Sequence, residues 1–387
     1  MSTKKRHNSK HKNNNSGGRL RSFFRGVLIL FTLLASLGLI VASYGGDFSP
    51  EKYRGICLMV MLFPWWALFM IVMTVLDAVW CRKALIICVL TYVACATALW
   101  EFAPLNLFTP DENDYPSNKK FTVMTYNICN FTNRDSVYPD GQNPSISFIL
   151  RENADVVCLQ EADGIHAQDK DVKISPAQID SLNKAYPYIY LYGYAQMLLS
   201  KYPAKLIPNG KKTLAGNEIA IFQLKVEGLP ITLINVHLQS YGLTDDDKHF
   251  YREITELNPG EEGIKKDLMN VKSQLLRKIQ YAAELRAEDA ERLGEYIRRF
   301  GGPNVILVGD FNDVPGCYTL RRMRDFDMKQ VYEEVGFGPM ITYYDNRFYF
   351  RIDHMLYRGS LEPLNIKRSS HDSSDHSPLI ATFGITE

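Results

Sequence analysis

The sequence predicts an N-terminal region of three transmembrane helices followed by an α/β domain, built as a sandwich of two β-sheets flanked by helices. Two observations carry this prediction. Three long apolar runs lie within the first 105 residues, and after residue 120 short runs rich in Val, Ile, Thr and aromatic residues alternate with helix-like stretches. Strands mixed with helices, each strand buried on at least one face, are typical of layered α/β domains.

The three apolar runs cover residues 26–44, 55–80 and 84–100. About 20 apolar residues are needed to cross the hydrocarbon core of a membrane as a helix. The first run contains no charged residue, and Asp77 is the one charge in the second. A buried globular helix is the alternative for each run, but three runs separated by short polar connectors favour spans. We therefore expect three transmembrane helices within residues 23–105.

A cleavable signal peptide is the alternative explanation of the first run, because basic residues precede it. The run is longer than the apolar part of a typical signal peptide, and two more apolar runs follow. We therefore assign Ala42 and Ser43 to the helix rather than to a cleavage site. Residues 1–22 are basic, polar and of low complexity, so we expect them to be disordered.

The distribution of lysine and arginine predicts the orientation in the membrane. The N-terminal tail carries eight of them, and the second connector carries Arg82 and Lys83. In the first connector Lys52 and Arg54 are balanced by two acidic residues. Basic segments stay on the cytoplasmic side. We expect an integral protein of the cell or inner membrane with a cytoplasmic N-terminus and an extracytoplasmic C-terminal domain.

Charge is divided in the same way along the chain. Residues 1–110 contain 12 Lys and Arg and 4 Asp and Glu, whereas residues 111–387 contain 32 and 39. An acidic domain is weak evidence against strong nonspecific binding of nucleic acid. Four of the seven cysteines lie in or beside the apolar runs, and no C-x-x-C spacing indicates a zinc site.

Polar residues lie at the ends of the predicted strands within residues 121–387, which follow a predicted linker at 106–120. Any one of them is more often a turn or cap residue than a functional one. Two histidines and four carboxylates at such positions indicate an active site on a rigid frame. The candidates are Asn127, Glu161, His237, Asp310, Asn312, Asp353, Asp375 and His376.

Six motifs contain these residues and follow one another between residues 121 and 383: MTYN, LQE, NVHL, VGDFND, RIDH and SDHSP. They resemble the endonuclease/exonuclease/phosphatase superfamily, which includes DNase I-like nucleases, neutral sphingomyelinases, inositol-polyphosphate phosphatases and deadenylases. The resemblance implies a DNase I-like fold, a four-layered sandwich of two mixed β-sheets flanked by helices. The chain resembles the nuclease, sphingomyelinase and deadenylase branches more than the abasic-site endonucleases, because those endonucleases lack the histidine that stands at position 237, in NVHL.

The resemblance also implies that the site binds a divalent metal ion, which would be Mg²⁺, with Mn²⁺ as a possible substitute. Glu161 would be its principal ligand, Asn127 would lie beside it, and Asp375 would be a further carboxylate at the metal. Carboxylate oxygens and water are the ligands that Mg²⁺ prefers. A divalent ion would neutralise charge on the phosphoryl oxygens during hydrolysis.

The catalytic roles implied by the resemblance fall to the other five residues. Asp310 would orient or deprotonate the attacking water, and Asn312 would donate a hydrogen bond to a phosphoryl oxygen. His376, oriented by Asp353, would contact the phosphate or the water. His237 would contact the phosphate or assist the departure of the leaving group.

We therefore expect a membrane-anchored, Mg²⁺-dependent phosphoesterase that hydrolyses a phosphodiester or phosphomonoester, lipid-linked or otherwise extracytoplasmic. An extracytoplasmic nuclease is the first alternative, so the expected substrate is a lipid headgroup or a nucleic acid. A non-catalytic binding module on the same fold is the second, although Glu161, Asp310 and Asp375 are all present. The lipid bilayer is an expected partner, and the sequence indicates no protein partner.

Overall fold

A computed structural model of the chain describes residues 16–132, 141–165, 174–193, 195–209, 218–242, 264–345, 349–370 and 373–386. The chain forms two compact units, and each is described by itself. The first comprises Met1–Ala42 and Leu62–Ala96, and the second comprises Ser43–Met61 and Thr97–Glu387. We refer to the second as the catalytic unit, because it carries all the candidate site residues.

The first unit is helical. Its helices are α1 (Ser16–Tyr44), α3 (Phe63–Trp80) and α4 (Leu85–Ala94), and α5 (Ala96–Phe102) follows. Two helices in the described residues, those within 18–47 and 63–80, are long and apolar enough to cross a membrane. A third span exists only if the bent pair 82–94 and 96–102 counts as one. By length and composition, two of the three predicted spans therefore have a matching helix, and the third corresponds to the bent pair.

Two expected boundaries differ in the structure. Helix α1 begins at Ser16, so residues 16–22, which we expected to belong to the disordered tail, are helical, and residues 1–15 lie outside the described residues. The second apolar run, 55–80, does not form one helix. It contains α2 (Ile56–Met61), which belongs to the catalytic unit, and α3, which begins at Phe63 with Pro64 in its first turn. Proline suits the start of a helix, because its missing N–H would be unpaired there.

Polar and small residues join the helices of the first unit. Asp77 is fully buried and accepts a hydrogen bond of 2.8 Å from the Thr32 hydroxyl. A Cβ on Gly38 would lie 2.2 Å from the ring of Trp66, so only glycine permits this approach of α1 and α3. Small residues and paired polar groups of this kind are typical of helix contacts in membranes.

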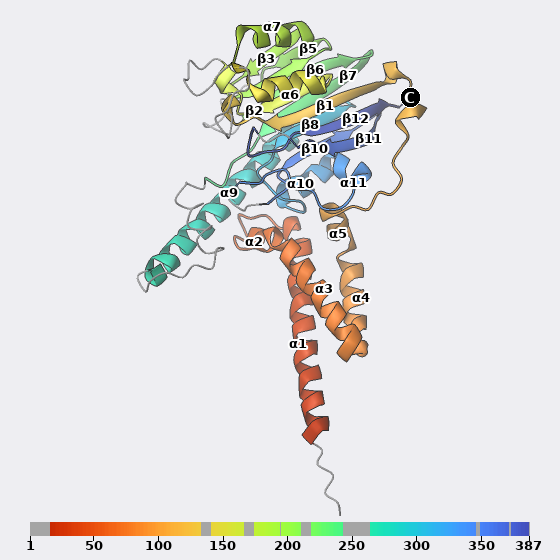
Figure 1. Ribbon diagram of the computed structural model, residues 1–387, viewed down its shortest axis with the longest axis vertical. Helices are drawn as coiled ribbons and strands as arrows, with labels where there is room; N and C mark the ends of the chain where they lie inside the picture. Colours follow the sequence, from red (N-terminus) through yellow and green to blue (C-terminus); the bar gives the residue numbers. More distant parts are fainter. Residues whose placement is uncertain are drawn as a thin grey trace, which may run out of the picture. The chain divides into compact units, whose positions relative to one another are not determined.

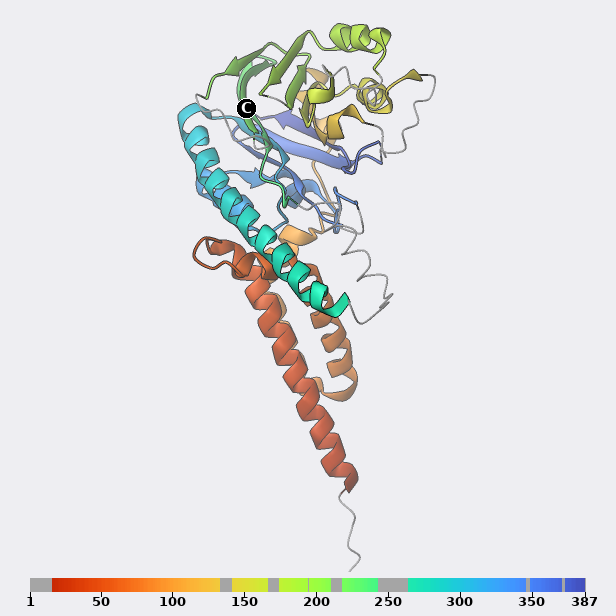
Figure 2. The same ribbon diagram turned by 90° about the vertical axis from the view of Figure 1, so that its left-hand side faces the viewer.

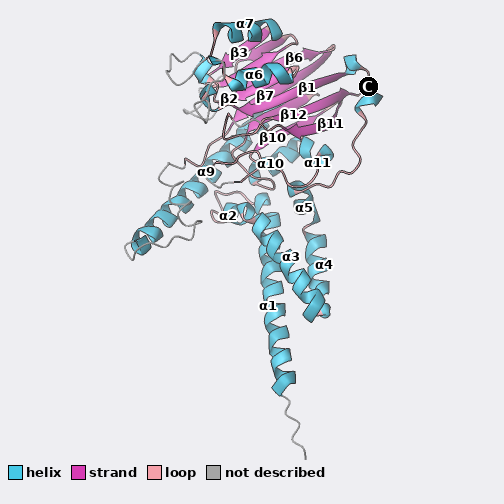
Figure 3. Cartoon of the chain, viewed as in Figure 1, coloured by secondary structure: helices cyan, strands magenta, loops and turns pink. Residues whose placement is uncertain are grey.

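The catalytic unit contains two mixed six-stranded sheets (Figures 1 and 3). The first has the order β11-β12-β1-β2-β4-β3, and the second has the order β5-β6-β7-β8-β10-β9. In the first sheet β1 and β2 are parallel, and in the second β7 and β8 are parallel. The strands are β1 (Lys120–Asn127), β2 (Val156–Gln160), β3 (Tyr188–Tyr192), β4 (Gln196–Ser200), β5 (Ala204–Ile207), β6 (Glu218–Val226), β7 (Leu229–His237), β8 (Val305–Asp310), β9 (Lys329–Gln330), β10 (Asp353–Arg358), β11 (Leu361–Arg368) and β12 (Leu379–Ile385).

Alternation of side chains along the strands builds the layers of the catalytic unit. In β1, Phe121 and Val123 are buried between the two sheets, whereas Met124 and Tyr126 pack on the helix side. That outer face is covered by α6 (Pro144–Glu152) and α7 (Pro176–Ala185). The outer face of the second sheet packs against α9 (Ile264–Phe300) and α10 (Tyr318–Met323), as Figure 2 shows for the long helix α9. The predicted sandwich of two mixed sheets flanked by helices is confirmed.

The segment Ser43–Met61, which we call the connector, is an integral part of the catalytic unit. Arg321 of α10 donates to the carboxylate of Asp47 at 2.8 Å and to the carbonyl oxygen of Ser43 at 2.6 Å. Arg321 also pairs at 3.1 Å with Glu101, near the end of α5. Val60 is 3% exposed and lies in the buried cluster that contains Phe311. The connector is therefore packed into the core and is not a simple surface loop.

The predicted linker at 106–120 is also packed. Asn106 donates hydrogen bonds to the carbonyl oxygens of Glu333 and Gly336, at 3.1 and 2.9 Å. Further along, Lys120 donates to the carbonyl oxygen of Glu112 at 2.6 Å. These bonds hold the segment on the surface of the sandwich.

We expect Gly46→Ala to destabilise the catalytic unit. A Cβ at Gly46 would lie 1.8 Å from the carbonyl oxygen of Gly316, and overpacking of this kind costs about 1–3 kcal/mol. Gly55→Ala is the matched control, because a Cβ at this other connector glycine meets nothing within 4 Å. Thermal unfolding of the detergent-solubilised full chain should give a lower Tm for Gly46→Ala alone. Equal Tm values for the two variants would contradict the packing of the connector.

Candidate active site

The candidate site lies between the two sheets, at one end of their inner faces. Phe121 and Val123 of β1 point between the sheets, so Asn127, at the same alternation, does too. The same alternation applies to the strands that carry the other inner residues. By this alternation Gln160, Asn235, His237, Asp310 and Asp353 also face the space between the sheets.

Strand pairing aligns these side chains in two rows. Asn127 is opposite Gln160 across the parallel pair β1 and β2. His237 is opposite Asp310 across β7 and β8, and Asp310 is opposite Asp353 across β8 and β10. Parallel strands end at the same edge of a sheet, so each row gathers at that edge. One row therefore belongs to each sheet.

Hydrogen bonds join the rows across the gap between the sheets. The Asn127 amide donates to Asp310 Oδ2 at 3.0 Å and to Glu161 Oε1 at 3.1 Å. Deeper in, Gln160 Nε2 donates to Asn235 Oδ1 at 2.6 Å. Our sequence analysis missed Gln160 and Asn235, which were detectable as polar residues at inward-facing positions of apolar strands. They fix the register of one sheet on the other beneath the site.

Asp310 is the centre of the cluster. Its Oδ2 lies 3.6 Å from His376 Nε2 and 3.7 Å from His237 Nε2, and its Oδ1 accepts the backbone N–H of Asn312 at 2.8 Å. His376 Nδ1 is 2.9 Å from Asp353 Oδ2. His237 Nε2 is also 3.6 Å from Glu161 Oε1.

Burial and charge shift the protonation equilibria in opposite directions. Burial raises the pKa of Asp310. Burial lowers the pKa of His376, but the carboxylates of Asp353 and Asp310 raise it more, to about 10. His376 is therefore an imidazolium near neutral pH, held between two carboxylates. A protonated imidazole donates from both ring nitrogens.

Two candidate residues have left-handed backbone conformations. Glu161 has φ 52° and Asn312 has φ 50°. Asparagine tolerates this conformation, whereas glutamate adopts it at a cost of order 1 kcal/mol or more. The left-handed turn at Glu161 follows directly after β2, and its carboxylate faces the pocket beside Asn127. Such strain clusters at functional sites.

The loop that carries Asp375 and His376 is tied to β1. The Ser374 hydroxyl donates to the carbonyl oxygen of Asn127 at 2.8 Å and accepts the backbone N–H of His376 at 3.1 Å. On the other side, Thr342 Oγ1 accepts the N–H of Asp353 at 3.1 Å. Sequence reasoning missed Ser374 and Thr342, and Ser374 could have been read from its place in SDHSP. Both residues orient the His376–Asp353 pair.

A pocket of about 210 Å³ opens over this cluster. Its lining combines polar residues with the apolar Met61, Ile279, Phe350 and Ile352. Asn127 and Asp353 do not line it but are bonded to residues that do. The other six predicted residues line it: Glu161, His237, Asp310, Asn312, Asp375 and His376.

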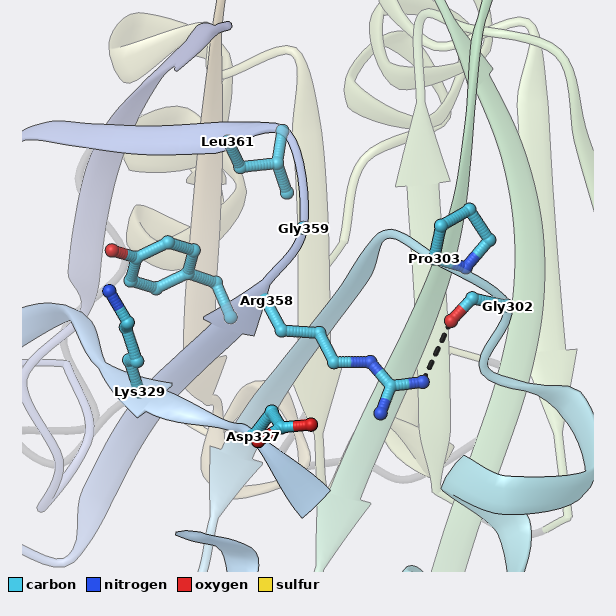
Figure 4. A pocket seen from close by; sticks show the side chains of 8 residues that line it. Gly302, Pro303, Asp327, Lys329, Arg358, Gly359 and Leu361 are labelled. Carbon is cyan, nitrogen blue, oxygen red and sulfur yellow. Dashed lines mark hydrogen bonds between the residues drawn. The ribbon is translucent and has the colours of Figure 1, made fainter.

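A second hollow lies away from this chemistry. Figure 4 shows it beside Lys329, Arg358 and Gly302, where Arg358 donates to the carbonyl oxygen of Gly302 at 2.7 Å. Arg358 is opposite Val305 at the start of β8, whereas the candidate site is at the other end of that strand. The second hollow contains none of the predicted site residues.

The donor set fits a hard divalent cation. Four carboxylates and the two histidines meet here, and no lysine or arginine is among the described residues that line the pocket. The tightest set of candidate ligand atoms, within 4.8 Å of one another, is Asp310, Asp353 and His376, which differs from the predicted set. His376 Nδ1 is already bound to Asp353, and Glu161 is a third exposed, so we retain the oxygen ligands as the prediction.

His354, next to Asp353 in the RIDH motif, is not part of the site. Its Nε2 lies 2.9 Å from the carbonyl oxygen of Asp313, and burial lowers its pKa to about 3. It is therefore a neutral core histidine.

A fully buried arginine, Arg286 of α9, contacts the segment that follows β7. Its Nη1 donates a hydrogen bond to the carbonyl oxygen of Gln239 at 2.9 Å.

We expect the stabilising contribution of His376 to be lost at alkaline pH. A group whose pKa is raised from 6.5 to about 10 on folding stabilises the fold fully below pH 6.5 and loses this effect as pH rises through about 10. In EDTA, the Tm deficit of His376→Gln should therefore be largest near pH 6 and shrink toward pH 10. His354→Gln is the control, because the fold keeps this histidine neutral: its deficit should be smallest near pH 6, where the unfolded imidazole takes up a proton, and should not shrink toward pH 10. A His376→Gln deficit that is constant or grows with pH would refute the charged pair.

Comparison with known proteins identifies the family. A profile described as the endonuclease/exonuclease/phosphatase family matches residues 124–376. Among curated proteins, the UPF0294 protein VP2298 of Vibrio parahaemolyticus is 30% identical over 112 residues, covering 28% of this chain and 35% of that protein. The chain thus matches about a third of the length of this relative.

Several solved structures are similar to this chain at low sequence identity. Truncated Caenorhabditis elegans TDP2 is 19% identical, with 68% of this chain and 98% of that chain covered and a TM-score of 0.40. The endonuclease/exonuclease/phosphatase from Beutenbergia cavernae is 16% identical, with coverages of 69% and 72% and a TM-score of 0.43. A family protein from Bacteroides thetaiotaomicron is 15% identical, with coverages of 69% and 98% and a TM-score of 0.41.

The profile match covers more than half of the chain, including all eight predicted site residues, and confirms the family resemblance. The chain belongs to the endonuclease/exonuclease/phosphatase family.

Proposed function

We propose that this chain is a membrane-anchored, Mg²⁺-dependent phosphoesterase whose catalytic unit faces the extracytoplasmic side. The observation that carries the chemical part is the buried Asp310, which is bonded to Asn127 and flanked by His376 and His237. A carboxylate placed among two imidazoles at the floor of an open pocket is suited to acid–base chemistry on a bound ester.

The metal would be bound on the side of the pocket where oxygen donors gather. Glu161, Asn127 and Asp375 would hold it, and Mn²⁺ would substitute for Mg²⁺. A bound divalent cation supplies charge neutralisation to the phosphoryl oxygens. The excess of carboxylates over basic side chains among the described lining residues supports this assignment.

The remaining residues would act on the water and the phosphate. Asp310 would orient the water and accept its proton, since burial raises the pKa of this carboxyl group. His376, protonated and fixed by Asp353, would donate from Nε2 toward the phosphate. His237 would donate to the phosphate or to the departing oxygen. Asn312 has one amide N–H bonded to the Leu238 carbonyl oxygen at 3.1 Å, which leaves the other for a phosphoryl oxygen.

The membrane part of the proposal is supported by composition. Helices within 18–47 and 63–80 are long and apolar enough to cross a membrane. The basic tail favours the cytoplasm for the start of the first helix, and the pair Arg82 and Lys83 favours it for the end of the second. With a third crossing by the bent pair 82–94 and 96–102, the catalytic unit lies outside the cell.

A substrate panel tests the function directly. The full chain is required, because the catalytic unit includes the connector Ser43–Met61, which a truncation after residue 105 would remove. The purified protein in detergent should be assayed with Mg²⁺ on DNA, RNA, sphingomyelin, phosphoinositides and small monoesters. Hydrolysis of lipid or small esters would support the proposal. Hydrolysis of nucleic acid alone would show a nuclease, and no hydrolysis of any substrate would leave a binding module.

We expect Asp310→Asn to abolish most turnover without unfolding the protein. The change keeps the size of the side chain but removes the charge that accepts a proton, so kcat should fall by at least about 10²-fold. Asp180→Asn, on the exposed surface of α7, is the matched control and should leave kcat unchanged. EDTA should abolish the activity of the wild type, and Mg²⁺ or Mn²⁺ should restore it. Normal turnover by Asp310→Asn would end the catalytic assignment.

We expect the two ends of the chain to lie on opposite sides of the membrane. In intact spheroplasts, a membrane-impermeant maleimide should label Asn365→Cys, an exposed position on β11, above the wild-type background. Ser9→Cys should be labelled only after permeabilisation, because the basic tail favours the cytoplasm. Labelling of both variants in intact spheroplasts would contradict the proposed orientation.

A further inference from the structure

The apolar side of the active-site pocket is made by segments from distant parts of the chain. Met61 comes from α2 in the connector, Ile279 from α9, and Phe350 from the segment bridged to Tyr343. Tyr343 in turn is bridged to His376 and packs its ring 5.0 Å from the imidazole. We call Met61, Ile279 and Phe350 the apolar wall. It lines the same pocket as the carboxylates and histidines.

The apolar wall is a fixed part of the site. Val60, the neighbour of Met61, is buried with Phe311 of the GDFND motif. A Cβ on Gly45 would lie 2.7 Å from Val60, so the start and the end of the connector are closely packed. Helix α2 also contacts α9, which carries Ile279 (Figure 1). An apolar surface that is held open beside a polar site indicates a ligand with an apolar part.

The covalent chain links this wall to an apolar helix. Met61 is followed by Leu62 and then by Phe63, the first residue of α3. Consecutive Cα atoms are about 3.8 Å apart, so the start of α3 lies within roughly 8 Å of Met61, whatever the orientation of that helix. Helix α3 is one of the two described helices that are long and apolar enough to cross a membrane, so Met61 of the pocket lining is two residues away in the sequence from a candidate span.

We propose that the substrate of this site is a lipid phosphate ester whose hydrocarbon chain packs against Met61, Ile279 and Phe350 while its phosphate reaches Asp310 and His376. This inference rests on the proposed phosphoesterase function. In the reaction, the oxygen of water bonds to phosphorus as one ester P–O bond breaks. The proton of the water passes by way of Asp310 to the solvent, and the departing oxygen receives a proton.

Charge distinguishes a lipid from a nucleic-acid strand as the ligand. A strand carries a phosphate on every nucleotide, and proteins bind it through several lysines and arginines. The described residues that line the pocket include neither. A lipid phosphate ester has one phosphate at this site and needs an apolar surface instead, which the wall provides. Aromatic residues such as Phe350 also stack on bases, so a nucleoside ester is the alternative to test.

A series of p-nitrophenyl phosphodiesters tests the proposal with a constant leaving group. The second ester group is methyl, butyl, hexyl, octyl or decyl, and a thymidine 5′ ester represents nucleic acid. The full chain in detergent with Mg²⁺ is assayed by release of p-nitrophenolate. Each methylene that reaches the apolar wall should raise kcat/KM about threefold to fourfold, until the wall is covered. The decyl ester should exceed the thymidine ester.

A matched pair of variants assigns the effect to the wall. Met61→Gln should lower the ratio of kcat/KM for decyl to methyl esters by roughly tenfold, because it replaces an apolar contact with a polar one. Met59→Gln changes the same residue type in the same helix outside the pocket lining, and should keep the wild-type ratio. The ratio cancels any common loss of folded enzyme and any partition into micelles. Met61→Leu should restore it, which excludes misfolding as the cause.

The outcomes separate this inference from the function on which it rests. Two results together support the lipid assignment. The value of kcat/KM rises with the length of the alkyl chain, and the decyl-to-methyl ratio of kcat/KM falls for Met61→Gln but not for Met59→Gln. Turnover of all esters without dependence on chain length overturns it and leaves the phosphoesterase intact. A preference for the thymidine ester over the decyl ester also overturns it. No turnover of any ester refutes the proposed function itself.

Discussion

The site depends on one hydrogen bond between the sheets, from the Asn127 amide to Asp310 Oδ2. Asn127 ends a strand of the first sheet and Asp310 ends a strand of the second, so this bond holds together the two rows of functional residues. Asp310 is 1% exposed, and a buried carboxylate is tolerated when partners saturate its oxygens. The Gln160–Asn235 bond at 2.6 Å lies deeper and fixes the same alignment. Geometry in the pocket is thus set by polar contacts that the apolar layer between the sheets cannot specify by itself.

Much of this arrangement was predictable from the sequence, because strand ends and alternation are local properties. Apolar alternation in β1, β7 and β8 indicates which side chains face inward, and it places Asn127, His237 and Asp310 on the inner faces of the two sheets. The motif order then groups all eight residues. The sequence shows Gln160 and Asn235 as inward-facing polar residues. It does not show that they bond to each other, because this pairing depends on how one sheet is positioned on the other. The left-handed conformation of Glu161 is equally invisible, since no glycine or asparagine marks it.

The connector shows where hydropathy fails as a guide. Residues 55–80 form one apolar run, yet Val60 is buried in the catalytic core and α3 begins only at Phe63. Burial in a protein core and burial in a membrane both select apolar side chains, so hydropathy does not separate them. Pro64 was the available signal, because proline favours the first turn of a helix and marks a break before it. The structural role of Gly46 follows from its packing on the loop after GDFND, which no local pattern reveals.

The polar residues and the apolar wall line the same pocket, which therefore combines two unlike surfaces. The proposed cation would offset the carboxylates of the polar residues, since the described lining residues supply positive charge only through histidine. The apolar wall needs no charge and is built partly from Met61, the last residue of the catalytic unit before the first unit resumes at Leu62. A site for a soluble, highly charged ester would gain nothing from such a wall. An enzyme that takes a phosphate from a hydrocarbon environment would require both surfaces, since the phosphate loses hydration while the chain must stay out of water. The division of the pocket is thus a physical reason to look for the substrate among membrane amphiphiles.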